Sequence, residues 1–313
     1  MGALREREAE IYDRQIRLWG VEAQQRMSSS KVLFAGFSGA CAEASKNLVL
    51  AGFNATIQDS KTVSVADLGA NFFLRDSSIG GNRSGKSLER LQALNSMASV
   101  ECVTEPIEKL PDSFFQAFQV VCLCGASLTH QKRIDGICRE KGIALYIVEC
   151  FGQNGYIMMD LGKHSYRPEK GSKVLDLVEL VYPTVSEACD VLWSDLQDRW
   201  GKVSKIYVMA QLLFSFQEAK GRRPGPSDSQ EMCSFGAKEL KRNGVEGYLD
   251  NDELEQLSVT AGAELSPICA ILGGLLGQEV VKAISLKGEP ALNVFVLDGN
   301  TCQAKVFRSP KAP

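Results

Sequence analysis

Residues 31–59 read KVLFAGFSGACAEASKNLVLAGFNATIQD, and this stretch decides the fold class. The apolar run KVLFA fits a buried parallel strand, and a glycine-containing turn follows it at Gly36. CAEASKNLVLA then reads as a helix that ends at Gly52, because glycine is favoured at helix C-termini. FNATIQ predicts a second strand, with Asp59 directly after it. The stretch therefore forms one strand-turn-helix-strand unit.

Alternating strands and helices continue to about residue 160 and return near the C-terminal end. SVECVTE, FQVVCLCG and ALYIVEC read as strands, and SGKSLERLQALN and QKRIDGICREKG as helices. A more polar, helical region follows, and then the apolar helix SPICAILGGLLGQEVVKAIS and the strand NVFVLDG. We therefore predict an α/β, Rossmann-like fold with a mostly parallel sheet. Its expected parts are an N-terminal helical arm (1–28), a Rossmann-like half (29–164), a helical insertion (165–264) and a C-terminal helix and strand (265–313).

Composition narrows the functional classes. The chain has 313 residues, 44% of them hydrophobic, and a net charge of −3, so we expect no nucleic-acid partner. The charged start MGALREREAE predicts no secretory signal, and PICAILGGLLG is shorter than the roughly 20 residues of a membrane span. We therefore expect an intracellular protein with no membrane partner. Its ten cysteines contain no C-x-x-C pair, so they are expected to be reduced core residues, with no metal site.

The segment IGGNRSGKSL (79–88) fits the P-loop pattern G-x-x-x-x-G-K-[ST]. A P-loop lies between an apolar strand and a helix, whereas NFFLRDSSI before this segment is loop-like. No later strand ending in Asp supplies the second motif of such a site. We therefore interpret the segment as the glycine-rich start of a helix and keep a P-loop ATPase as a remote alternative.

The turn after the first strand is the better-placed nucleotide candidate. Asp59 lies 23 positions after Gly36, close to the spacing at which a carboxylate binds a ribose. However, GFSGAC has the spacing G-x-x-G-x-C rather than G-x-G-x-x-G, with Cys41 in place of a glycine. A purely structural turn and a dinucleotide site both stay open here. The second possibility corresponds to an NAD-dependent Rossmann oxidoreductase.

Residues 8–27 predict an amphipathic helix that Gly20 bends or interrupts. Its apolar face is formed by Tyr12, Ile16, Trp19, Ala23 and Met27. Arg14 lies about 200° around the helix from Tyr12. We therefore expect the Arg14 side chain to point away from the core.

Five stretches together resemble one family: YDRQIRLWGVEAQQR, KNLVLAGF, NFFLRDSSIG, ECFGQNGY and PICAILGGLLGQEVVKAIS. They are similar to the Aos-type small subunits of SUMO-activating enzymes, among the ubiquitin-like modifier activating enzymes. The resemblance implies a ThiF/MoeB-type adenylation fold in a heterodimer with a catalytic Uba-type subunit. That partner binds Mg-ATP and adenylates the C-terminus of SUMO, and the complex is expected in the nucleus, with the cytoplasm as an alternative.

Compared with catalytic members of this family, the chain departs from the pattern at four places. Its phosphate turn reads GFSGAC; Ala70 replaces a phosphate-binding arginine; Arg83 stands at a lysine position; and Ala126 stands at the metal-binding aspartate. Only Asp59 matches, as the ribose carboxylate. The resemblance therefore implies that the pocket formed by Gly36, Gly39 and Arg83 is vestigial. The chain alone is expected to bind no cofactor and to be inactive, because adenylation needs Mg²⁺ and cations around the triphosphate.

The resemblance gives Arg14 a different role. In the family, the Arg of this R-Q pair reaches the ATP phosphates bound by the other subunit, with Arg17 as a weaker second candidate. The chain is then a non-catalytic subunit that supports adenylation in trans. Two further alternatives stay open: the regulatory subunit of a NEDD8-type activating enzyme, and a self-sufficient MoeB-type homodimer.

Overall fold

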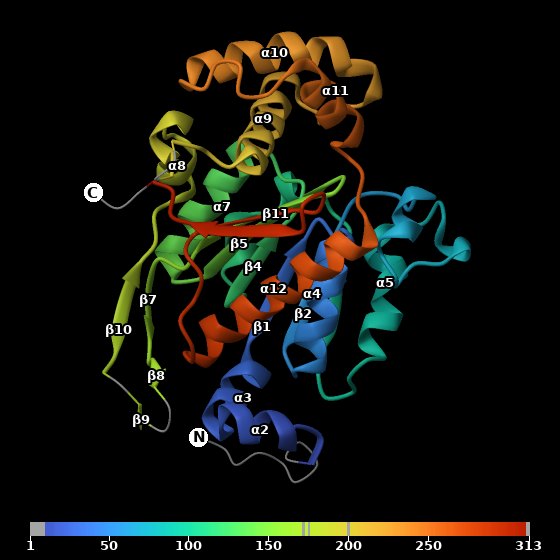
Figure 1. The fold of residues 1–313 in the computed structure, drawn as a ribbon. Coiled ribbons are helices and arrows are strands. Elements are labelled where there is room, and N and C mark those ends of the chain that lie inside the picture. Colours follow the sequence, from blue (N-terminus) through green and yellow to red (C-terminus); the bar gives the residue numbers. More distant parts are fainter. Residues whose placement is uncertain (1–9, 171–172, 175, 199–200, 311–313) are drawn as a thin grey trace.

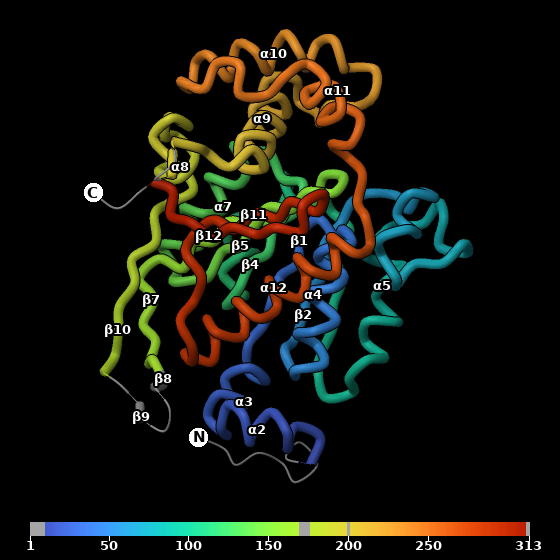
Figure 2. The backbone as a smooth tube through the Cα atoms, viewed as in Figure 1, coloured from blue at the N-terminus to red at the C-terminus, as the bar shows by residue number. Residues whose placement is uncertain are grey.

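The computed structural model describes residues 10–170, 173–174, 176–198 and 201–310. Its centre is an eight-stranded sheet in the order β12-β11-β6-β5-β4-β1-β2-β3 (Figures 1 and 2). β1 to β5 run parallel, β6 and β12 run against them, and β11 is again aligned with β5. The predicted α/β fold with a mostly parallel sheet is confirmed. The strands are β1 (Lys31–Ala35), β2 (Asn54–Gln58), β3 (Val100–Val103), β4 (Val120–Leu123), β5 (Ala144–Phe151), β6 (Asn154–Asp160), β11 (Val294–Asp298) and β12 (Gln303–Phe307).

The predicted first unit forms as β1, α4 (Gly39–Leu50) and β2. β1 has four consecutive buried residues, as expected of a strand covered on both faces. Ser38 caps α4 by accepting a hydrogen bond from the Cys41 amide at 3.5 Å. Gly36 has φ +76°, and a Cβ there would lie 2.0 Å from the Cys124 carbonyl oxygen. The turn therefore needs glycine for close packing against the end of β4.

Helices cover both faces of the sheet. α4 and α12 (Ser266–Ser285) pack on one face, and α7 (Leu128–Lys141) and α9 (Lys205–Lys220) on the other. Two shorter helices are α5 (Arg83–Gln92) and α6 (Asp112–Phe115). The chain also forms short 3-10 turns at Ala66–Gly69, Asp76–Ser78, Ile107–Lys109, Trp193–Leu196 and Pro226–Asp228. By length and composition α12 could cross a membrane, as could no other helix in the described ranges, but most of it is buried. At Gly273 a Cβ would lie 2.4 Å from the Glu43 Cβ, so α12 and α4 are in very close contact.

The region expected as a helical insertion also contains strands. β7 (Lys163–Tyr166) pairs with β10 (Val178–Val181), and β8 (Glu169–Lys170) pairs with β9 (Lys173–Val174). Helices follow at α8 (Val185–Cys189), α9, α10 (Ser229–Arg242) and α11 (Asn251–Thr260). The sequence does not predict the two-stranded ribbon of β7 and β10. Its strands are short and only partly buried, so their hydrophobic alternation is weak. The C-terminal segment likewise supplies two strands rather than the single one expected.

The N-terminal helical stretch is broken as the sequence suggested. α2 (Asp13–Trp19) and α3 (Val21–Ser29) meet at Gly20, which has φ +86°. Of the predicted apolar face, Tyr12, Ala23 and Met27 are buried, whereas Ile16 and Trp19 are half-buried. Arg14 is exposed, as predicted. The first nine residues of the expected arm lie outside the described residues.

Two buried carboxyl groups meet where α7 crosses the end of β6. Asp160 accepts hydrogen bonds from Arg139 at 2.6 and 3.1 Å. Asp135 accepts from the Val185 amide at 2.9 Å, and its carboxyl group lies within hydrogen-bonding reach of Asp160. Burial, and then the neighbouring Asp160, raise the pKa of Asp135 to about 8. A proton on Asp135 would therefore be retained in the folded chain at neutral pH.

We expect the Asp135→Asn substitution to change how stability depends on pH. The folded pKa lies above the unfolded value of about 3.9, so the folded chain binds the extra proton between about pH 4 and 8. This group therefore makes stability fall as pH rises through that window, by at most about 1.4 kcal/mol per pH unit. The asparagine variant should lose this dependence and exceed the wild type in stability at pH 8, as measured by urea unfolding. The exposed Asp190→Asn change is the control; equal pH slopes for wild type and D135N would contradict the assignment.

Candidate functional site

A cavity of about 630 Å³ lies at the carboxyl ends of the parallel strands. β1 lies between β4 and β2, so the strand order reverses here, which is where ligands bind in doubly wound sheets. The wall is built from the turns after the strands, from α9 and from the segment that leads into α12. It includes Ser38, Lys61, Arg83, Cys124, Glu149, Gln217, Arg223 and Glu264. Of the predicted pocket residues, Arg83 lines this cavity. Gly36 and Asp59 line an adjoining smaller hollow, and Gly39 borders the cavity through its hydrogen bond to Glu264.

The first turn of α4 is already bound to a carboxylate of the chain itself. The Gly39 amide donates a hydrogen bond to Glu264 Oε2 at 2.9 Å. Helix N-termini attract phosphates through such amides, so Glu264 takes the position that a phosphate would need. Burial raises the pKa of Glu264, while the Gly39 amide and the Arg83 charge favour its ionised form.

The space around this helix start is also filled. A Cβ at Gly39 would lie 2.8 Å from the Ala70 Cβ and 2.9 Å from Cys269 Sγ. Ala70 is almost fully buried, as is Ala126 after β4. The positions at which the resemblance implied a lost arginine and a lost metal ligand therefore carry packed methyl groups. Within the described ranges, no cluster of three metal-ligating side chains occurs.

Asp59 and Arg83 form a buried ion pair beside this turn. The Arg83 Nε donates to Asp59 Oδ2 at 2.7 Å, and its second arm reaches Asp67 Oδ1 at 2.8 Å. The Lys61 amide occupies Asp59 Oδ1 at 2.8 Å. Only 2% of Asp59 and 8% of Arg83 are exposed. A ribose hydroxyl or a phosphate would have to displace these internal partners to reach either side chain.

The pKa values of Arg83 and Asp67 are both shifted in the direction that favours the charged form. Burial alone would lower the pKa of Arg83, but the carboxylates of Asp59 and Asp67 raise it. Partial burial acts to raise the pKa of Asp67, but hydrogen bonds from Ser64 and Arg83 hold it below its usual range. Arg83 and Asp67 are therefore both ionised at neutral pH.

A second ion pair closes the opposite wall. Arg223, just after α9, contacts Glu149 Oε2, and the Gly125 amide donates to Glu149 Oε1 at 2.8 Å. The ammonium of Lys61 lines the cavity and forms no ion pair with any described residue. Three carboxylates (Asp67, Glu149 and Glu264) thus face three cations (Lys61, Arg83 and Arg223) in this cavity. A triphosphate would enter a site without the excess positive charge that it requires.

The P-loop-like segment has a different structural role. Gly80 and Gly81 form a turn that bonds back to Val63, and the Asn82 side chain caps α5 through the Gly85 amide at 2.8 Å. No strand leads into it. The prediction that it is a glycine-containing helix start is confirmed.

Arg14 and Arg17 lie far from this cavity. α3 leads directly into β1, so both helices lie at the amino end of the sheet, whereas Gly36 lies at the carboxyl end (Figure 1). The five residues of β1 alone span about 16 Å. Arg17 pairs with Asp13 at 3.0 Å, whereas Arg14 is exposed and has no ion-pair partner in the part of the chain that the structure describes. Neither arginine can serve the chain's own cavity.

Glu264, Glu149 and Arg223 are the site residues that the sequence did not reveal. Glu264 lies 225 positions from its partner Gly39, and Arg223 lies 74 positions from Glu149. Neither pair has a local motif. The acidic Glu149 inside the apolar strand segment VEC is a signal that could have marked one of them. Glu264 carries no comparable signal, because it is half-buried and its neighbours are exposed.

We expect Asp59→Asn to destabilise the chain by about 3 kcal/mol, because removing one partner leaves the Arg83 charge buried and poorly compensated. Asp67→Asn is the matched control with a smaller expected loss of about 1 kcal/mol, since Asp67 is more exposed and Arg83 keeps Asp59. Urea unfolding at pH 7 measures both. A D59N chain as stable as the wild type would show that Asp59 is free for a ligand rather than structural.

Known proteins are similar to this chain along nearly its whole length. The ThiF family model matches residues 12–313. SUMO-activating enzyme subunit 1 of Homo sapiens is 37% identical over 326 residues, covering 95% of this chain and 94% of that protein. The same-named proteins of Rattus norvegicus (38%, covering 94% and 92%) and Danio rerio (36%, covering 94% and 92%) are similar to it as well.

Among solved structures, selenomethionine PaaA matches with a TM-score of 0.61 and 17% identity, covering 98% of this chain and 85% of that one. At that identity the match supports the fold alone. The family model and the curated relatives named above, in contrast, match the sequence itself over more than nine-tenths of the chain. The chain therefore belongs to the ThiF family and, within it, to the family of SUMO-activating enzyme subunit 1.

Proposed function

We propose that this chain is the non-catalytic small subunit of a heterodimeric SUMO-activating enzyme. Its Uba-type partner would bind Mg-ATP and adenylate the C-terminus of SUMO, and this chain would contribute Arg14 in trans to the ATP phosphates. The observation that carries the proposal is the internal carboxylate of Glu264 on the first turn of α4. A chain that closes its own phosphate site contributes to the reaction through another subunit's site.

The charges of the cavity support the same division of labour. Adenylation shifts negative charge onto departing pyrophosphate, which cations and Mg²⁺ must neutralise. Here Arg83 and Arg223 are each paired with internal carboxylates, and a buried Ala126 stands where a metal ligand was expected. Bound ATP would gain at most the Lys61 ammonium.

The exposed face of the N-terminal helices supports a role for Arg14 across an interface. A guanidinium is a permanently charged, planar donor that suits a developing phosphate charge. Large apolar side chains are exposed on α2, α3, α4 and α12, namely Leu18, Val21, Leu50 and Ile271. α3 and α4 both contact α12, so these helices form one surface that a second subunit would cover. We propose a nuclear location for the complex, with the cytoplasm as the alternative.

The first test is ATP–pyrophosphate exchange by the purified chain with and without its Uba-type partner. We expect no SUMO-dependent exchange by the chain alone and full exchange after the partner is added. Exchange by the lone chain would instead indicate a self-sufficient, MoeB-type enzyme. Saturable NAD binding by the lone chain would favour a Rossmann oxidoreductase, and exchange with NEDD8 but not SUMO would identify the related activating enzyme.

The second test is Arg14→Ala in the assembled pair. Loss of a charged donor at the transferring phosphates should reduce SUMO-dependent exchange about 100-fold while leaving assembly unchanged. Arg17→Ala is the matched control, because the Arg17 guanidinium is paired with Asp13. Size-exclusion chromatography reports assembly. Wild-type exchange by the R14A complex would rule out the role in trans.

A further inference from the structure

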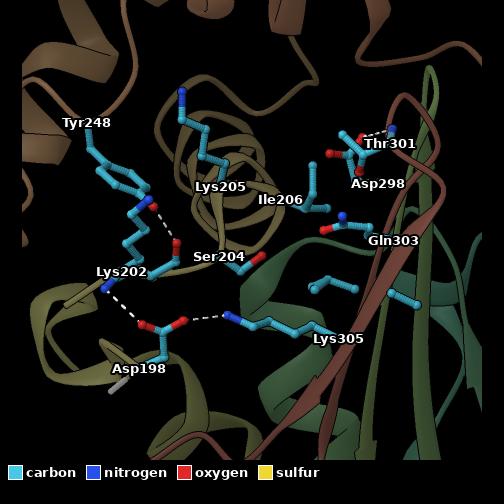
Figure 3. Close-up of a pocket in the computed structure, with 13 residues that line it drawn as sticks. Asp198, Lys202, Ser204, Lys205, Ile206, Tyr248, Asp298, Thr301, Gln303 and Lys305 are labelled. Carbon is cyan, nitrogen blue, oxygen red and sulfur yellow. Dashed lines mark hydrogen bonds and ion pairs between the residues drawn. The ribbon is translucent and has the colours of Figure 1, made fainter. Parts of the chain in front are cut away.

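A groove runs between β12 and the segment that leads into α9 (Figure 3). It has a volume of about 720 Å³ and continues into a more apolar hollow of about 360 Å³. Lys202 and Lys305 converge on Asp198: the Lys202 amide donates to Asp198 Oδ1 at 3.1 Å, and Lys305 Nζ lies 2.8 Å from Oδ2. Tyr248 donates a hydrogen bond to the Val203 carbonyl and so fixes the far wall.

β12 lines one side of this groove and is the edge strand of the sheet. It pairs on one side with β11, from Asp298 opposite Gln303 to Val294 opposite Phe307. The backbone groups on its other side belong to no ladder of the described sheet. Such an edge can accept an added strand from another chain. Its side chains are mostly exposed, so nothing in the described chain covers it.

The groove carries positive charge in a chain of net charge −3. Its lining has four cations, Lys202, Lys205, Lys305 and Arg308, against two carboxylates, Asp198 and Asp298. Lys205 also pairs with Glu253 and Lys305 with Asp198. The Lys202 ammonium has no ion-pair partner among residues 10–170, 173–174, 176–198 and 201–310. A negatively charged occupant is therefore complementary to this wall.

The apolar end of the groove, at Phe307, lies two positions along β12 from the cationic part at Lys305. Lys305 and Phe307 share one face of β12, because side chains alternate along a strand. Phe307, Leu196 and Leu292 line the smaller hollow, and Leu292 is 45% exposed. A docked strand would thus meet a cationic site and an apolar site at a separation of two residues.

We propose that this groove binds an extended, acidic segment of a partner protein, which adds a strand to β12. One carboxylate lies beside Lys202 and Lys305, and an apolar side chain two positions away packs against Phe307 and Leu292. The groove belongs to the face of the sheet that α9 covers, since Val203 and Ile206 pack in that core. The exposed apolar surface of α12 lies on the other face, so both sites can be occupied together.

The test uses fluorescein-labelled synthetic peptides and the full chain in an anisotropy titration. The probe has the order Gly-Thr-Val-Thr-Asp-Thr-Gly, which places Val and Asp on one face of a strand. A control with the same composition, Gly-Thr-Val-Asp-Thr-Thr-Gly, places them on opposite faces, and a third peptide carries Lys in place of Asp. We expect the probe to bind at least about tenfold more tightly than either control.

Two variants test the protein side. Lys202→Glu with Lys305→Glu should weaken probe binding about tenfold or more, whereas the equal charge change Lys109→Glu with Lys238→Glu at remote exposed sites should not. Lys202→Gln alone, which removes an unpaired charge, should weaken it to a smaller extent and guards against misfolding of the double variant. Hydrogen exchange at residues 303–307 should slow when the probe binds. Equal binding of the three peptides, or unchanged exchange in β12, would overturn the proposal.

Discussion

The close contact between α12 and α4 is the constraint on which the rest of the structure depends. Gly273 lets the α12 backbone approach the first turns of α4, and a side chain there would collide with Glu43 and the Ala40 carbonyl. The contact joins the C-terminal helix to the first strand-helix-strand unit across more than 200 residues of chain. It also places Glu264, two residues before α12, on the first amide of α4. The same packing that completes the core therefore places a carboxylate of the chain itself on the first amide of this helix.

A cavity can disfavour a nucleotide through its charges even where it has enough volume to hold one. The cavity keeps a volume of about 630 Å³, so shape alone would not exclude a nucleotide. Two of its three cations, however, are held by internal carboxylates in buried pairs: Arg83 with Asp59, and Arg223 with Glu149. Opening such a pair leaves charges uncompensated in a poorly solvated site, which costs several kcal/mol. The charges around this cavity thus contribute to the stability of the fold.

The sequence predicted those features that depend on local pattern. Buried parallel strands such as β1 show as apolar runs, and the turn at Gly36 shows as a glycine between strand and helix. The ribbon of β7 and β10 was missed because partly exposed strands carry little periodicity, and β12 because its residues QAKVF are mostly exposed. The partners of Gly39 and Glu149 come from distant segments, and no spacing rule links such positions. The motifs pointed to this end of the sheet, and only the folded chain showed which side chains pair there.

The two faces of the sheet carry different kinds of exposed surface. On the side of α12, exposed apolar side chains such as Leu18 and Ile271 favour a large, dry contact with another folded subunit. On the side of α9, the groove beside Lys305 offers one strand edge and a few charges, which suits a short extended segment. A contact of the first kind needs a preformed partner surface, whereas the second needs only a flexible stretch of chain. The two surfaces do not compete for the same part of the sheet, because β12 is the last strand of the described sheet and its outer edge stays open.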